Sequence, residues 1–204
     1  MSGSETIVVR TGTANLASVL AAMKRLGAPA RTSNDPRDVE DADRVILPGV
    51  GAFAAAMCCL HDGGLVDPLK RRIDAGRPTL GICLGMQLLF DASDESPGCP
   101  GLGLAPGRIR QFTNEVRIPQ MGWNEIVADP SCTLLQTGYA YFANSYRATD
   151  VPEGWSPAIA NHGGPFVAAM ERGPILACQF HPELSGQFGL DLIQRWLDLG
   201  GTSC

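Results

Sequence analysis

Several features that would indicate other classes of protein are absent from this sequence. No Cys-x-x-Cys pair occurs among its seven cysteines, which argues against a zinc ribbon and a thioredoxin-like redox motif. No apolar run is long enough to span a membrane, and the first six residues lack the basic and apolar regions of a signal peptide. The net charge of −5 gives no electrostatic reason to expect nucleic acid as a partner. We therefore expect a cytoplasmic protein with reduced thiols, bound neither to a membrane nor to nucleic acid.

Nucleotide-binding patterns are missing as well. Neither Gly-x-Gly-x-x-Gly nor a P-loop occurs, so the glycine after the first predicted strand gives little support for a phosphate site. We expect no cofactor and no metal. The chain has 204 residues, 45% of them hydrophobic, which suits a single domain over residues 1–204 with an ample core.

Strands and helices alternate in the first half of the chain. Short apolar runs at 7–9, 30–32, 44–47 and 78–82 predict buried strands, and helical spacing predicts helices over 16–26, 52–60, 65–75 and 84–90. Such alternation is typical of a mostly parallel sheet flanked by helices. From residue 93 the pattern changes to short strands separated by turns, at 108–112, 124–127, 140–142, 158–160, 166–170 and 175–180. We interpret these as an antiparallel extension of the sheet, followed by a helix from about 187 to 199.

Cys83 occupies the junction between a predicted strand and a predicted helix. Gly81 and Gly85 flank it, which gives the Gly-x-Cys-x-Gly pattern of a nucleophile elbow. Glycine at both flanks avoids collisions in so sharp a turn, and a helix N-terminus favours a thiolate. The alternative is a small buried hydrophobic residue, the ordinary role of a free cysteine, but the glycines and their context favour a nucleophile.

A general base must come from one of only three histidines. His181 follows the last predicted strand in Phe180-His181-Pro182-Glu183, and strand ends in such sheets are where ligands gather. His181 as base and Glu183 as its orienting carboxylate would complete a Cys-His-Glu triad. Without Cys83, a surface or satisfied core histidine would be equally plausible. The loop that includes Gly49 and Gly51 could line an anion pocket or be an ordinary turn.

Taken together, Gly-Ile-Cys-Leu-Gly-Met-Gln and the downstream Phe-His-Pro-Glu resemble the class I (triad) glutamine amidotransferases, over essentially the whole chain. Pro-Gln-Met-Gly-Trp-Asn at 119–124 narrows the resemblance to the glutaminase subunits of imidazole glycerol phosphate synthases, in histidine biosynthesis. This family implies a flavodoxin-like, three-layer α/β fold and hydrolysis of L-glutamine through a thioester on Cys83.

The resemblance also implies roles for further residues. Backbone N–H groups of Val50, in the loop with Gly49 and Gly51, and of Leu84, directly after Cys83, would bind the oxyanion. Four positions would hold the substrate, with the Glu95 carboxylate on its ammonium group: Gln87, Glu95, Ser145 and Tyr146.

A separate (β/α)8-barrel cyclase is the partner that the family implies, in a heterodimer through which ammonia is channelled. Asn15, Met121, Trp123 and Tyr141 would lie at or near that interface, although Trp123 could instead be a core aromatic residue. This chain departs from the family at Arg10-Thr11 (often Tyr), at Asn144 (commonly His) and at Leu184 (commonly Lys). The last change puts a salt bridge to the cyclase in doubt.

Two other functions stay open at this point. The chain could serve another acceptor, such as anthranilate or aminodeoxychorismate synthase, although the 119–124 segment argues against it. It could also be a non-catalytic regulatory subunit of the same fold, which the intact Cys83, His181 and Glu183 make improbable.

Overall fold

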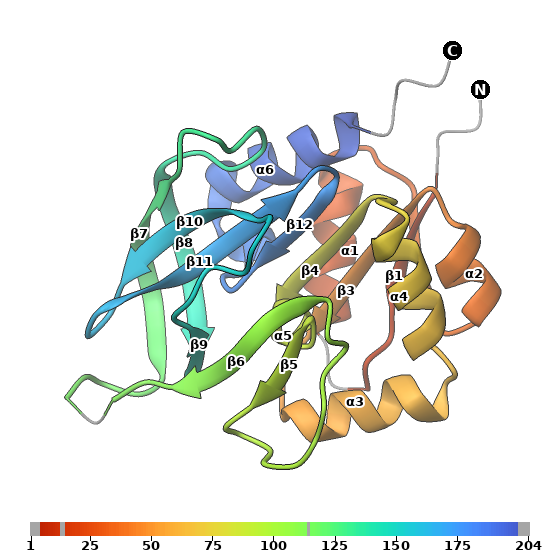
Figure 1. Cartoon of the computed structure of the whole chain (residues 1–204). Coiled ribbons are helices and arrows are strands. Elements are labelled where there is room, and N and C mark those ends of the chain that lie inside the picture. The colour runs from red at the N-terminus through yellow and green to blue at the C-terminus, as the bar shows by residue number, and fades with distance from the viewer. Residues whose placement is uncertain (1–4, 13–14, 114, 200–204) are drawn as a thin grey trace.

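A nine-stranded mixed sheet forms the centre of the protein in the computed structural model, which describes residues 5–12, 15–113 and 115–199 (Figure 1). Its strand order is β2-β1-β3-β4-β12-β11-β10-β7-β8. Five neighbouring strands run parallel: β2 (Ala30–Ser33), β1 (Thr6–Val9), β3 (Arg44–Gly49), β4 (Thr79–Cys83) and β12 (Ile175–Cys178). Four antiparallel strands extend it: β11 (Pro165–Arg172), β10 (Ser156–Asn161), β7 (Gln120–Ala128) and β8 (Gly138–Asn144). The predicted sheet with its antiparallel extension is confirmed, except that the run at 175–180, which was expected in the extension, forms β12 and pairs in parallel with β4. A short apolar run does not reveal the direction in which its strand will pair.

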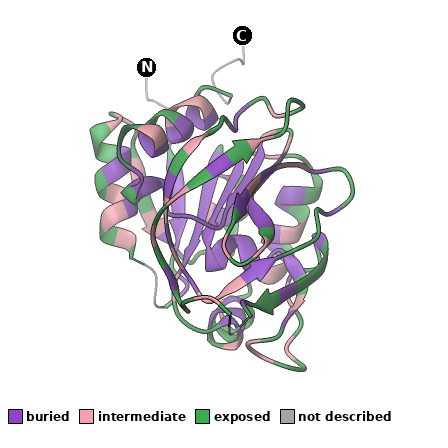
Figure 2. Cartoon of the chain, turned by 90° about the vertical axis from the view of Figure 1, so that its left-hand side faces the viewer, coloured by how far each residue is buried: buried purple, intermediate pink, exposed green. Residues whose placement is uncertain are grey.

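Helices cover both faces of the parallel strands, because the strands are apolar on both sides (Figure 2). Ile7, Val45 and Leu47 share one core with α2 (Pro36–Asp41), α3 (Phe53–Asp62) and α4 (Val66–Asp74). Val8 and Ile46, at alternate positions, share the other core with α1 (Leu16–Arg25) and α6 (Gly186–Asp198). The result is the expected three-layer arrangement. None of the described helices is long and apolar enough to cross a membrane.

The predicted helix over 84–90 was wrong in length. Helix α5 spans only Leu84–Gln87, and Phe90 already begins strand β5 (Phe90–Ser93). All residues of 84–90 are buried, and a short run that is apolar on every side does not distinguish a helix from a strand.

A second, three-stranded sheet was not predicted. Strand β6 (Ala105–Gln111) pairs in parallel with β5 and antiparallel with β9 (Tyr146–Ala148). The run at 108–112 was expected to belong to the main sheet, but residues 108–111 lie in β6 and therefore in this smaller sheet, below the main one in Figure 1. Strand β6 is mostly exposed and carries little of the apolar alternation that reveals strands in a sequence. Cys204 and residues 1–4, where the sequence lacks the pattern of a signal peptide, lie outside the described residues.

Candidate active site

Cys83 ends strand β4 in a strained backbone conformation. Its φ of 54° and ψ of −110° make it the one non-glycine residue with positive φ in the described part of the chain. Such a conformation costs about 1–3 kcal/mol and persists only where the surroundings enforce it. Strain of this kind at a cysteine between a strand and a helix is the geometry that the Gly-x-Cys-x-Gly pattern predicts.

Close packing explains the glycines around Cys83. A Cβ atom on Gly85 would stand 1.8 Å from the carbonyl oxygen of Leu47 on the neighbouring strand β3. A Cβ on Gly81 would lie 3.1 Å from the backbone of Gly85. A Cβ on Gly49 would lie 2.9 Å from the Cβ of Leu84. The turn therefore fits only because these positions lack side chains.

The short length of α5 revises one part of the sequence interpretation. A macrodipole is the sum of aligned peptide dipoles, and α5 has only four residues. The expected support of a thiolate by a helix N-terminus is correspondingly weak, so other groups must stabilise the sulfur.

His181 lies beside Cys83 because β12 is the parallel neighbour of β4. Cys178 is in register with Ile82, so the carboxyl ends of both strands meet at one edge. His181 Nδ1 is 2.9 Å from Glu183 Oε1, and the two side chains are 7% and 2% exposed. Glu183 belongs to a short 3-10 turn, η1 (Pro182–Leu184).

The hydrogen-bond partners of His181 favour its protonated form. Burial by itself lowers the pKa of His181, but hydrogen bonds with the Cys83 sulfur and with the Glu183 carboxylate outweigh burial and raise the pKa to about 10. The imidazole therefore carries a proton at neutral pH. A protonated imidazole beside a cysteine is the arrangement that supports a thiolate nucleophile.

A cavity of about 180 Å³ opens next to the Cys83 sulfur. Besides Cys83, seven residues expected at the site line this cavity, together with two that were not expected. The lining residues are Val50, Gly51, Cys83, Leu84, Gln87, Glu95, Ala143, Asn144, Ser145 and Tyr146. Gly49 is the expected residue that packs behind Leu84 instead of lining the cavity. Ala143 and Asn144 were not assigned to the site from the sequence.

Glu95 is held by the first residue of α3, the helix that follows the loop with Gly49 and Gly51. Its Oε2 accepts a hydrogen bond of 2.7 Å from the backbone N–H of Phe53, the first residue of α3. The carboxylate thus caps α3 from the β5–β6 loop while it lines the cavity. A negative charge at that place suits the ammonium group of an amino acid.

Gln179 is a site residue that sequence reasoning missed. Its side chain is fully buried and reaches both the Cys83 sulfur, at 3.8 Å, and the Gln87 amide, at 2.9 Å. The signal available in the sequence was a single amide within the otherwise apolar run 175–180, because a buried polar side chain needs a partner.

Three of the four residues expected at a partner interface lie on the paired strands β7 and β8, and the fourth lies at the start of α1. Met121 and Trp123 are 67% and 58% exposed on β7, so Trp123 is not a core residue. The Trp123 ring meets Tyr141 on β8 edge to face, with centroids 6.1 Å apart. Asn15 caps α1 through Ser18 N–H, and α1 packs beside η1. An exposed apolar surface of this kind is typical of a docking face.

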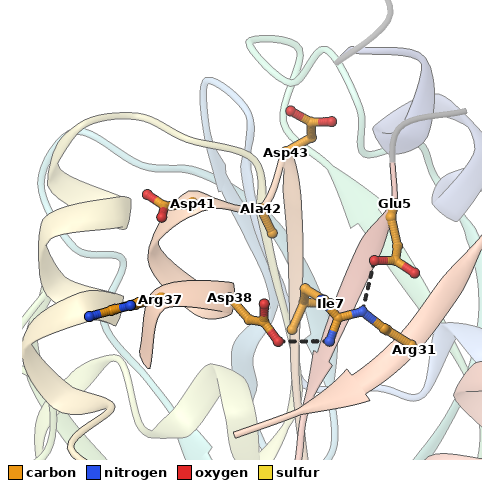
Figure 3. A pocket seen from close by; sticks show the side chains of 8 residues that line it. All are labelled: Glu5, Ile7, Arg31, Arg37, Asp38, Asp41, Ala42 and Asp43. Carbon is orange, nitrogen blue, oxygen red and sulfur yellow. Dashed lines mark hydrogen bonds and ion pairs between the residues drawn. The ribbon is translucent and has the colours of Figure 1, made fainter. Parts of the chain in front are cut away.

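A larger cavity, of about 300 Å³, lies at the opposite end of the parallel strands (Figure 3). Arg31 bridges Glu5 and Asp38 there, at 2.8 and 2.7 Å. The hydrogen bond from Arg31, followed by that from Ser33, lowers the pKa of Asp38 to about 2. Arg31, Glu5 and Asp38 pair with one another and no cysteine, serine or threonine is among the lining residues, so this cavity is not the candidate active site. No group of three or more His, Cys, Asp or Glu side chains placed to hold a metal occurs within 5–12, 15–113 and 115–199.

Comparison with known proteins agrees with this geometry. Residues 11–197 match the family model described as "Glutamine amidotransferase class-I". The chain is 42% identical over 195 residues to the imidazole glycerol phosphate synthase subunit HisH of Streptococcus gordonii, covering 93% of this chain and 94% of that protein. It is 40% identical over 193 residues to the chloroplastic imidazole glycerol phosphate synthase hisHF of Arabidopsis thaliana, covering 91% of this chain and 33% of that protein.

Solved structures show the same fold at lower identity. A crystal structure of a glutamine amidotransferase superposes with a TM-score of 0.77 at 22% identity, covering 96% of this chain and 99% of that chain. The family model spans most of the sequence, and the curated relatives extend over nearly all of it. The chain belongs to the class-I glutamine amidotransferase family.

Proposed function

We propose that this chain is the glutaminase subunit of an imidazole glycerol phosphate synthase and forms one glutamine amidotransferase domain. The observation that carries the proposal is the strained Cys83 beside the His181–Glu183 pair, at the mouth of a cavity of about 180 Å³. The similarity to HisH subunits supports this assignment over a glutaminase subunit of anthranilate or aminodeoxychorismate synthase. We place it in the cytoplasm, since the six described cysteines are free thiols of the kind a reducing compartment maintains.

The acylation step uses Cys83 and His181. The Cys83 thiolate attacks the side-chain carboxamide carbon of glutamine, a C–S bond forms, and the carbonyl electrons move to the oxygen. His181 then gives its proton to the amide nitrogen, the C–N bond breaks, and ammonia leaves behind a thioester. Glu183 holds the imidazole through the 2.9 Å hydrogen bond to Nδ1.

Deacylation reverses the role of His181. The neutral imidazole takes a proton from water as the water oxygen attacks the thioester, and the C–S bond breaks to release glutamate and the thiolate. Both tetrahedral intermediates carry an oxyanion, which backbone N–H groups of Val50 and Leu84 would bind. Each such donor contributes about 3 kcal/mol to transition-state stabilisation.

Four cavity residues would hold the substrate glutamine, three of them at its amino-acid end. Glu95 would pair with the ammonium group, and the segment with Ser145 and Tyr146 would hold the carboxylate end. Gln87 would position the carboxamide near the sulfur.

The exposed face of β7 and β8 would dock a (β/α)8-barrel cyclase. Met121, Trp123 and Tyr141 offer apolar and aromatic area there, the side-chain types enriched at interfaces. Ammonia would pass through the closed interface to a ribulosylformimino intermediate, unprotonated and protected from loss to water. The plant relative hisHF is a single, longer protein, which agrees with a partner that works beside this domain.

A steady-state glutaminase assay with and without a cyclase subunit and its ribulosylformimino nucleotide tests the proposal. We expect little hydrolysis by the chain alone, strong stimulation by both additions, and no activity in Cys83→Ala. Full activity in isolation would contradict gating by the partner. Failure to bind the cyclase, with ammonia delivered instead to anthranilate or aminodeoxychorismate synthase, would defeat the histidine assignment.

A further inference from the structure

Gln179 connects the nucleophile to the wall of the substrate cavity. It directly follows β12, where its backbone N–H donates to the Ala168 carbonyl at 2.8 Å, and its side chain is fully buried. Its Oε1 accepts a hydrogen bond of 2.9 Å from Gln87 Nε2. Its Nε2 lies 3.8 Å from Cys83 Sγ. Neither the acylation step nor the deacylation step uses this side chain.

The direction of every hydrogen bond in this chain of amides is fixed by one carbonyl. The Tyr146 carbonyl oxygen can only accept, and both Asn144 Nδ2 (3.0 Å) and Gln87 Nε2 (3.2 Å) approach it. Gln87 must therefore present its NH₂ group on this side. The same NH₂ group faces Gln179, so the atom of Gln179 that receives it must be the oxygen.

The remaining group of Gln179, its NH₂, must then face the sulfur. A thiol sulfur is a weak acceptor, whereas a thiolate is a strong one, and hydrogen bonds to charged groups are worth more than neutral ones. An amide N–H aimed at Cys83 Sγ therefore favours the charged sulfur. The one-turn helix α5 gives little help, which leaves room for such a donor.

We propose that Gln179 is a positioning residue that donates an N–H to the Cys83 thiolate while its oxygen fixes the orientation of the Gln87 amide. The inference rests on the proposed function, because it assigns the group that couples the nucleophile to the part of the cavity that receives the glutamine carboxamide. Gln179 acts through Cys83 and Gln87 and does not take part in bond making.

Two substitutions separate the two hydrogen bonds. Gln179→Met removes both, whereas Gln179→Glu keeps an acceptor for Gln87 and replaces the donor to the sulfur with a negative charge. Gln194→Met is the matched control, since Gln194 is on α6 and bonds only Asp198 among the contacts assigned to its side chain. All variants are measured in the full chain, with the cyclase added for turnover.

The first readout is the pH profile of Cys83 alkylation by iodoacetamide. In Gln179→Met we expect the midpoint of the profile to rise by about one pH unit, the size of one hydrogen bond to a charged group. Gln179→Glu should shift the midpoint further, because its carboxylate repels the thiolate. Profiles that match wild type and Gln194→Met would overturn the proposal.

The second readout is the division between kcat and KM for glutamine. Gln179→Glu should lower kcat with KM unchanged, since the Gln87 amide keeps its acceptor, whereas Gln179→Met should raise KM as well. Equal effects of both variants on KM would overturn the role in orienting Gln87. If neither variant folds, the side-chain amide resonances of Gln179 in ¹⁵N-labelled wild type must shift when Cys83 is alkylated, and unshifted resonances would overturn the proposal.

Failure of the proposed function is distinguishable from failure of this inference. A wild-type chain that hydrolyses no glutamine with the cyclase would defeat the proposed function, while the alkylation profiles would still report on Gln179. Active wild type with unmoved profiles would defeat only the role of Gln179.

Discussion

The strained backbone at Cys83 predicts that glycine is better tolerated there than alanine. Cys83→Ala and Cys83→Gly both remove the sulfur together with its contacts to Gln179 and His181. The two variants therefore differ in little but the backbone, which keeps a φ of 54° and a ψ of −110°. Alanine retains the steric strain of this conformation, and glycine does not.

The expected difference follows from two opposing effects. Relief of the strain is worth about 1–3 kcal/mol, and the extra chain entropy of glycine in the unfolded state costs about 0.5–1 kcal/mol. The net expectation is that Cys83→Gly is more stable than Cys83→Ala by about 1 kcal/mol. For a chain of this length, that is a rise in Tm of about 2–4 °C.

Urea unfolding followed by circular dichroism measures the difference. The control is the same pair of substitutions at Cys58, which is exposed on the regular helix α3. There glycine should be less stable than alanine by about 1 kcal/mol. A Cys83→Gly variant no more stable than Cys83→Ala would refute the reasoning that the elbow holds strain.

Three further predictions concern the packing, the substrate and the charge at the site. Gly85→Ala should destabilise the fold by about 3 kcal/mol in urea unfolding, because its Cβ would overlap the Leu47 carbonyl at 1.8 Å, and an unchanged midpoint would contradict this. Glu95→Gln should raise KM for glutamine about tenfold in the stimulated assay, since the ammonium group loses its anion, while kcat changes less. NMR titration should find the His181 imidazole protonated well above pH 6.5, with a midpoint near 10 that falls in Cys83→Ala. Because this pKa is raised on folding, its contribution to stability is fully present below pH 6.5 and is lost as the pH rises through about 10.

The parts of the molecule that local patterns specify could be predicted from the sequence. The buried strands are short runs of apolar residues, and the glycines around Cys83 indicate a turn in which a side chain would collide. His181 was expected near Cys83 because it follows a strand, and ligands gather at strand ends in such sheets, but the parallel pairing of β12 with β4 that brings the two residues together was not predicted. The end of α5 could not be predicted, since residues 84–90 are buried on every side and give no period.

Contacts between distant segments could not be predicted. Gln179 meets Gln87 and Cys83 across sequence separations of 92 and 96 residues, so its role depends on the register of β12 against β4. For Trp123, residue type alone would have favoured the core, and the expectation of an interface position rested on the family resemblance. Tryptophan is usually well buried, yet here it lies 58% exposed on β7 because its neighbours on that face are exposed as well.

Ser185 uses its hydroxyl to position the His181 loop and not to cap helix α6. A serine just before a helix indicates an N-cap, but Ser185 makes no side-chain hydrogen bond to α6. Its hydroxyl instead donates to the His181 carbonyl at 2.6 Å and accepts from the Tyr141 N–H at 2.9 Å, while the His181 N–H donates to the Tyr141 carbonyl. The loop that carries His181 is thereby tied to β8, the strand whose outer face carries the Tyr141 ring. A helix cap is worth about 1 kcal/mol, and its absence here is understandable because the same hydroxyl fixes the position of the His181 backbone.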